Sequence, residues 1–217
     1  MKRRTIDLVV SAGGLLLAVI LLVGGLVFTS NANFAKTYVR DQLSQQKITF
    51  PTVEAINANP ETAGTPCLLA NAGQPMTTGK QAECYANNFI GVHLKGIADG
   101  KTYAELGDVQ TDLRNQIAAL PAGDPRIAGL QDQLNTVNTE RDTVFKGETL
   151  RGLLLTSYGF SELGAKAALG ATVAYIGSGL LFLLAALGFW HGWRTPQTQA
   201  FAAVEAAGRR ERAGANA

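Results

Sequence analysis

The side chains best suited to chemistry in this 217-residue chain are its two cysteines and two histidines. Cys67 and Cys84 have 16 residues between them. A thiol pair can hold a metal, carry redox chemistry or form a structural disulfide, and redox pairs usually show a CxxC spacing. Because these cysteines are the only two and are widely spaced, we predict a structural disulfide. Closing a loop of this size contributes about 3 kcal/mol in the chain-entropy model.

The histidines are candidates for metal binding. Zinc sites need about four ligands, and non-haem iron takes two histidines and a carboxylate on one face. His93 lies nine positions after Cys84, which is a ligand only when reduced. The simpler interpretation is a helical His93 bonded to a nearby carbonyl or carboxylate. We predict no metal, no cofactor and no catalytic residue, and we find no GxGxxG, Walker P-loop, HExxH or GxSxG motif.

Two long uncharged runs dominate the chain. Residues 8–35 and 167–190 contain no Asp, Glu, Lys, Arg or His. A helix needs about 20 apolar residues to cross the hydrocarbon core of a bilayer, so we predict transmembrane helices at 8–29 and 166–190. A basic start before the first run also fits a cleaved signal peptide. The apolar core of a signal is typically about 7–15 residues, which favours an uncleaved anchor and leaves cleavage as the alternative.

Charges at the two ends predict the orientation. Positions 2–4 are basic, and Arg194 and three further arginines follow the second run. Cytoplasmic tails carry an excess of Lys and Arg. We therefore expect residues 1–7 and the basic tail 191–217 in the cytoplasm, the tail being disordered, and residues 30–165 outside it. The protein would then belong to the cell (plasma) membrane.

The central segment has the pattern of a small helical domain. Residues 30–166 hold 12 Lys and Arg against 14 Asp and Glu, and this acidic balance argues against nucleic-acid binding. Apolar spacing predicts helices beginning near Thr78 and over 102–120 and 126–145, the last two as an antiparallel pair. A Pro- and Gly-rich loop precedes Thr78. The fold class we predict is mainly α, with two transmembrane helices flanking a helical extracytoplasmic domain that holds one disulfide.

The spans carry two further signals. Trp190 and Trp193 followed by Arg194 are typical of a membrane interface. Small residues also recur four positions apart, a spacing that allows close contact between helices. These small residues are Gly14, Ala18, Gly170, Ala174 and Ser178. They predict that the two spans pack together or that the protein associates.

Two stretches carry a family resemblance. QAECYANNFIGVHLKGIADGKTYAEL (81–106) and VFKGETLRGLLLTSYGF (144–160), set between two spans, resemble a family of uncharacterised actinobacterial membrane proteins. Members are often labelled aromatic ring-opening dioxygenase of the LigA type, so the resemblance implies that activity. The residues argue against it. Ring opening needs two histidines and a carboxylate on one iron, whereas His93 and His191 are predicted on opposite sides of the membrane.

No motif assigns an activity, so the functional expectation follows from architecture. We expect an interaction, scaffold or accessory subunit of a cell-envelope complex. Its partners would be membrane lipids and another membrane or envelope protein, or a second copy. The alternative is a sensor or carrier that binds a small molecule or lipid in an apolar cavity around Tyr85, Phe89 and Ile117. An enzyme, the dioxygenase included, is the third hypothesis.

Overall fold

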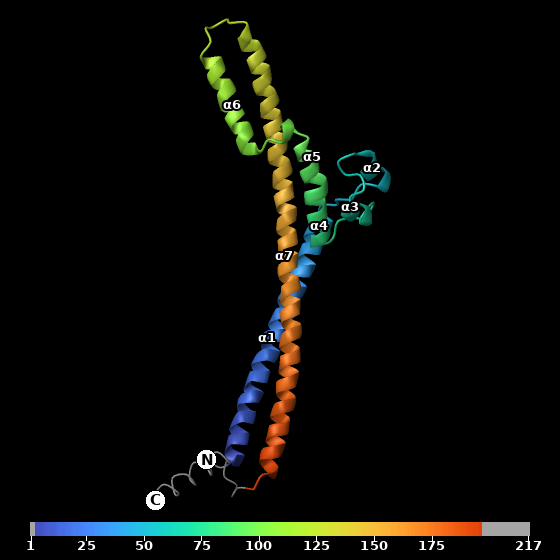
Figure 1. The fold of residues 1–217 in the computed structure, drawn as a ribbon, viewed down its shortest axis with the longest axis vertical. Helices are drawn as coiled ribbons and strands as arrows, with labels where there is room; N and C mark the ends of the chain where they lie inside the picture. The colour runs from blue at the N-terminus through green and yellow to red at the C-terminus, as the bar shows by residue number, and fades with distance from the viewer. Residues whose placement is uncertain (1–2, 197–217) are drawn as a thin grey trace, which may run out of the picture. The chain divides into compact units, whose positions relative to one another are not determined.

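The protein is described by a computed structural model over residues 3–196 (Figure 1). Helices make up 82% of this range, and no β-strand occurs in it. A single isolated bridge joins Thr49 to Pro75. The mainly α prediction is therefore confirmed. The predicted disordered tail lies, from residue 197 onward, outside the described residues.

Two long helices each contain one of the uncharged runs. Helix α1 is Arg3–Gln45, with 43 residues, and helix α7 is Arg126–Arg194, with 69 residues. Both are long and apolar enough to cross a membrane. We predicted 126–145 as a separate helix, but it is the first part of α7. No proline lies between Pro125 and Pro196, so nothing interrupts the backbone hydrogen bonding of α7.

The chain divides into two compact units. The first comprises the described parts of Met1–Asn33 and Ala165–Ala217, and we call it the apolar helix pair. The second is Phe34–Gly164, which we call the central domain. Each unit contains a part of α1 and a part of α7, and each is described below by itself.

Short helices build the central domain between α1 and α7. They are α2 (Val53–Ala58), α3 (Pro66–Ala70), α4 (Gly79–Tyr85), a π-helix η1 (Ala86–Ile90), α5 (Gly91–Lys95), a 3₁₀ turn η2 (Ala98–Gly100) and α6 (Tyr103–Ala118). Capping boxes begin α4 and α6, in which Thr78 pairs with Gln81 and Thr102 with Glu105. The backbone N–H of Thr102 lowers the pKa of the Glu105 carboxyl. The predicted helix start near Thr78 is confirmed.

One apolar core holds the central domain together. It takes side chains from the end of α1, from the short helices and from α7. Its buried members include Val39, Leu43, Phe50, Ile56, Leu68, Met76, Ala82, Ile90, Leu94 and Leu154. The Pro- and Gly-rich segment thus contributes Leu68 and Met76 to the core, and α3 forms within it. The segment that looked irregular in sequence is packed.

Glycines allow α4 and α5 to lie close against α7. A Cβ added to Gly79 would collide with the Ser161 side chain. A Cβ added to Gly91 would come within 3.3 Å of Arg151 Nε. These contacts place α4 and α5 along the same helix, and they fix which part of α7 belongs to the core.

Helix α6 and the first part of α7 form the predicted antiparallel pair (Figure 1). The ring of Tyr103, at the start of α6, lies 5.6 Å from the ring of Phe145. Gln110, later in α6, donates to Asn138, which is earlier in α7, so the two helices run in opposite directions. The Arg141 guanidinium stacks 4.0 Å over the Tyr103 ring and donates to Gln110 Oε1 at 2.6 Å. A polar network therefore fixes the register of this hairpin.

Candidate functional site

The apolar helix pair buries small side chains and exposes large ones. The buried side chains are those of Ser11, Ala18, Ala171, Ala174, Ser178, Ala185 and Thr195. Large apolar side chains point outward, with exposed fractions of 67% for Val10 and 65% for Leu183. Soluble proteins bury such residues preferentially, whereas helices packed in lipid place small residues at their contacts.

The small residues from the sequence analysis lie at or beside this contact. Ser178 Oγ donates to the Ala18 carbonyl at 2.8 Å. A Cβ on Gly14 would lie 3.9 Å from that of Ala185, and a Cβ on Gly170 would lie 3.6 Å from the Phe28 ring. Ala174 is buried on the same face of α7 as Ser178. The backbones of α1 and α7 can therefore approach closely along this face.

A second contact was missed in the sequence analysis. The Tyr175 hydroxyl and Thr29 Oγ1 are 2.9 Å apart, which joins the two helices by a hydrogen bond. A Cβ on Gly25 would lie 2.7 Å from the Tyr175 ring, but a Cβ on Gly24 would meet nothing within 4 Å. Only Gly25 makes room for this ring. The adjacent glycines Gly24 and Gly25 in the first uncharged run were the sequence signal for this contact.

The disulfide joins Cys67 of α3 to Cys84 of α4, with 6.0 Å between the Cα atoms, so its prediction is confirmed. The Asn88 side-chain amide donates to Cys67 Sγ and to the Cys84 carbonyl, both at 3.2 Å. Asn88 lies in the π-helix η1, which follows directly on α4. Both sulfurs are covalently committed, so neither is a thiolate ligand for a metal.

The histidines lie in different units. His93 Nδ1 in α5 is 2.7 Å from the Phe89 carbonyl in the preceding π-helix η1, which is the bond expected of a structural histidine. His191 Nε2 lies 3.9 Å from Asp7 Oδ2 in the apolar helix pair. Within residues 3–196, no three His, Cys, Asp or Glu side chains gather closely enough to hold a metal ion.

The carrier alternative calls for an apolar cavity around Tyr85, Phe89 and Ile117, but Ile117 is not part of the cluster on which Tyr85 and Phe89 pack. The ring of Tyr85 packs edge-on against that of Phe50, with 5.3 Å between the centroids, and lies tilted against that of Phe89 at 4.7 Å. Burial raises the pKa of the Tyr85 hydroxyl. Ile117 belongs instead to α6, where the neighbouring Gln116 lines a groove with the start of α7. Tyr85 and Phe89 are therefore packed on each other, and Ile117 belongs to a different helix.

A groove of about 650 Å³ does lie between α5, α6 and α7. Its basic lining residues are Lys95, Lys101 and Arg151. Arg151 pairs with Glu148 at 3.1 Å, and Lys101 pairs with Asp99 at 3.4 Å. Much of the positive charge is therefore neutralised within the domain, which makes the groove a weak site for an anion.

Comparison with known proteins adds no family. No protein-family model, curated protein or solved structure matches this chain.

One face of α7 in the central domain is exposed and uncharged. It consists of Phe145, Thr149, Gly152, Thr156, Gly159 and Leu163, which we call the α7 seam. The seam residues are spaced alternately four and three apart, as along the contact line of a coiled coil. A Cβ added to Gly152 or Gly159 would meet nothing within 4 Å. The seam was not predicted from the sequence, although the spacing of its residues is visible there.

The seam has room and chemistry for another helix. Phe145 and Leu163 have exposed fractions of 53% and 63% and mark its two ends. The hydroxyls of Thr149 and Thr156 donate to the Phe145 and Gly152 carbonyls, so their donors are already satisfied within α7. An apolar helix could cover the seam without leaving these hydroxyl donors unpaired.

Proposed function

We propose that this protein is a two-pass integral membrane protein of the cell membrane that acts as an interaction subunit of an envelope complex. The observation that carries the membrane part is the inverted packing of the apolar helix pair. Exposing large apolar side chains to water costs about 25 cal/mol per Å² of apolar area. Lipid removes that cost, and small residues then serve helix contact.

The proposed orientation has both tails in the cytoplasm and the central domain outside. Basic residues at positions 2–4 and at Arg194 support it, because cytoplasmic ends of spans are enriched in Lys and Arg. The Cys67–Cys84 bridge supports it independently, because disulfides persist in oxidising compartments.

Cysteine labelling in intact cells tests this orientation. We expect a membrane-impermeant maleimide to label Thr136→Cys, an exposed position on α7 of the central domain, before lysis. Thr5→Cys, exposed in the first turns of α1, should react only after lysis. The reverse order would contradict the orientation. Recovery of the protein in the soluble fraction would contradict the membrane proposal itself.

The interaction role rests on the α7 seam. Its four-three spacing suits a left-handed pairing of helices, and its small residues would let a partner backbone come close. The seam carries no charge, so its partner face should be apolar too. The occupant we propose is an apolar helix of another membrane or envelope protein.

Site-specific photo-crosslinking tests that occupant. We expect a photoreactive phenylalanine analogue at Thr156, inside the seam, to give one discrete adduct with a second protein in cells. The control position is Thr143, an exposed threonine of α7 outside the seam whose hydroxyl makes the same kind of backbone bond. It should give no such adduct.

Three outcomes of the crosslinking would contradict the proposed occupant. Equal adducts from Thr156 and Thr143, or none from either, would mean that the seam is not a docking face. An adduct at twice the 22.9 kDa mass of the chain would assign the seam to a second copy instead of another protein.

The other hypotheses have less support. A carrier needs an enclosed apolar site, but Tyr85 and Phe89 pack on each other and Ile117 lies elsewhere. Ring opening needs two histidines and a carboxylate on one metal, but within residues 3–196 no three His, Cys, Asp or Glu side chains gather to hold one. We therefore base the proposal on interaction.

A further inference from the structure

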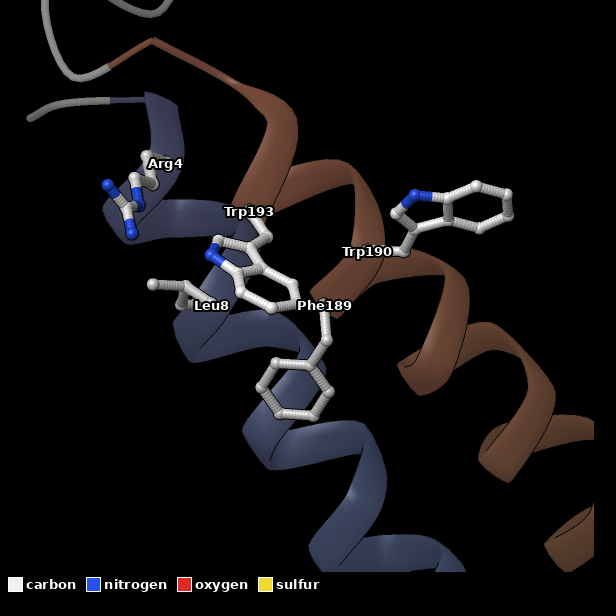
Figure 2. Close-up of a pocket in the computed structure, with 5 residues that line it drawn as sticks. All are labelled: Arg4, Leu8, Phe189, Trp190 and Trp193. Atoms are coloured by element: carbon white, nitrogen blue, oxygen red, sulfur yellow. The ribbon is translucent and has the colours of Figure 1, made fainter.

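A cleft lies at the end of the apolar helix pair that holds the chain's first described residues. Arg4 and Leu8 of α1 and Phe189, Trp190 and Trp193 of α7 line it, and its volume is about 440 Å³ (Figure 2). Figure 2 shows Trp193 between the two helices, next to Leu8 and above Phe189, and Arg4 on the adjoining turn of α1. The apolar and aromatic side chains of the cleft therefore lie beside the positively charged guanidinium of Arg4.

The composition of the cleft fits the boundary between lipid and water. Trp193 has an exposed fraction of 81% and Trp190 of 55%, which are large apolar areas for side chains in water. Indole combines an apolar ring with one N–H donor and therefore prefers the headgroup region of a bilayer. Leu8 and Phe189 continue the apolar wall along the helices, in the direction an acyl chain would take.

The charge of the cleft is positive. Among the described residues that line it, Arg4 alone is charged, and the guanidinium of Arg194 lies 4.9 Å over the Trp190 ring. The nearby carboxylate of Asp7 does not line the cleft, because its Oδ2 atom lies toward His191 at 3.9 Å. A guanidinium matches a phosphate group well, because its planar N–H donors can form two parallel bonds.

We infer that this cleft binds one anionic phospholipid of the cytoplasmic leaflet, with Arg4 on the headgroup phosphate and an acyl chain against Leu8 and Phe189. The inference rests on the proposed membrane placement. A lipid suits the cleft better than free phosphate, because four of the five lining residues are apolar or aromatic and would gain nothing from the inorganic ion. Basic residues at a cytoplasmic interface also favour anionic over zwitterionic headgroups.

Native mass spectrometry of the full-length detergent-extracted protein tests the inference. Phosphatidylglycerol, phosphatidylcholine and inorganic phosphate are added as separate probes. We expect one phosphatidylglycerol to bind preferentially, and Arg4→Gln to weaken its binding roughly tenfold through loss of a charged hydrogen bond. Trp193→Ala should also weaken it. The control is Arg3→Gln, an exposed neighbour that does not line the cleft and should leave binding unchanged.

Each other outcome overturns the inference. Equal binding of the two lipids, or equal loss in Arg3→Gln and Arg4→Gln, would leave no specific site. Binding of inorganic phosphate as strong as that of the lipid would make it a phosphate site. Alkaline carbonate extraction of the same variants separates this inference from the proposed function. Protein that stays in the membrane without a lipid preference refutes only the cleft, whereas protein that extracts refutes the membrane placement.

Discussion

Replacing Cys84 by serine should release residues 57–80 first and lower the free energy of unfolding of the central domain by about 3 kcal/mol. The bridge closes the chain between α3 and α4. Without it, the segment that carries Leu68 and Met76 gains more conformational entropy when it opens. Opening this segment therefore costs less free energy.

Hydrogen exchange of the detergent-extracted protein measures this effect. We expect faster exchange over 57–80, and little change in α6, which lies in the hairpin away from the bridge. Cys67→Ser should behave like Cys84→Ser, and so should the wild type under reducing conditions. Unchanged exchange over 57–80 in all three would mean that packing alone holds the segment.

The architecture was readable from the sequence because its signals are local. Uncharged runs and helical spacing act within a few turns, and they located α1, α6 and the start of α4. The continuity of α7 was missed. The polar pattern of 126–145 and the apolar run after 166 look like different helices, yet the backbone has no breaker between them.

The candidate sites were predictable only in part, for a physical reason. Spacing selected Ala18 and Ser178, because small residues four apart share a face. It could not show that Gly25 faces Tyr175, because that contact depends on how two distant helices are rotated. The α7 seam is similar, because exposure of its residues depends on which other face of α7 the short helices cover.

Gly25→Leu should separate the apolar helix pair, whereas Gly24→Leu should not. A Cβ at Gly25 would lie 2.7 Å from the Tyr175 ring, so a leucine must displace that ring and break its hydrogen bond to Thr29. Overpacking of this kind costs about 1–3 kcal/mol. At Gly24 an added Cβ meets nothing within 4 Å, so the same substitution one position earlier is the matched control.

A cysteine pair reports the separation in membranes. Gly14→Cys and Ala185→Cys place their Cβ atoms about 3.9 Å apart, within the range of a disulfide. A protease site inserted at 121–124 then cuts the chain between α6 and α7. After the cut, the disulfide between positions 14 and 185 is the only covalent link between the two fragments. Cys67 and Cys84 both lie in the N-terminal fragment, so the native bridge does not interfere. We expect efficient linkage with Gly24→Leu and much weaker linkage with Gly25→Leu. Equal linkage would show that the α1–α7 contact does not depend on the space Gly25 leaves for Tyr175.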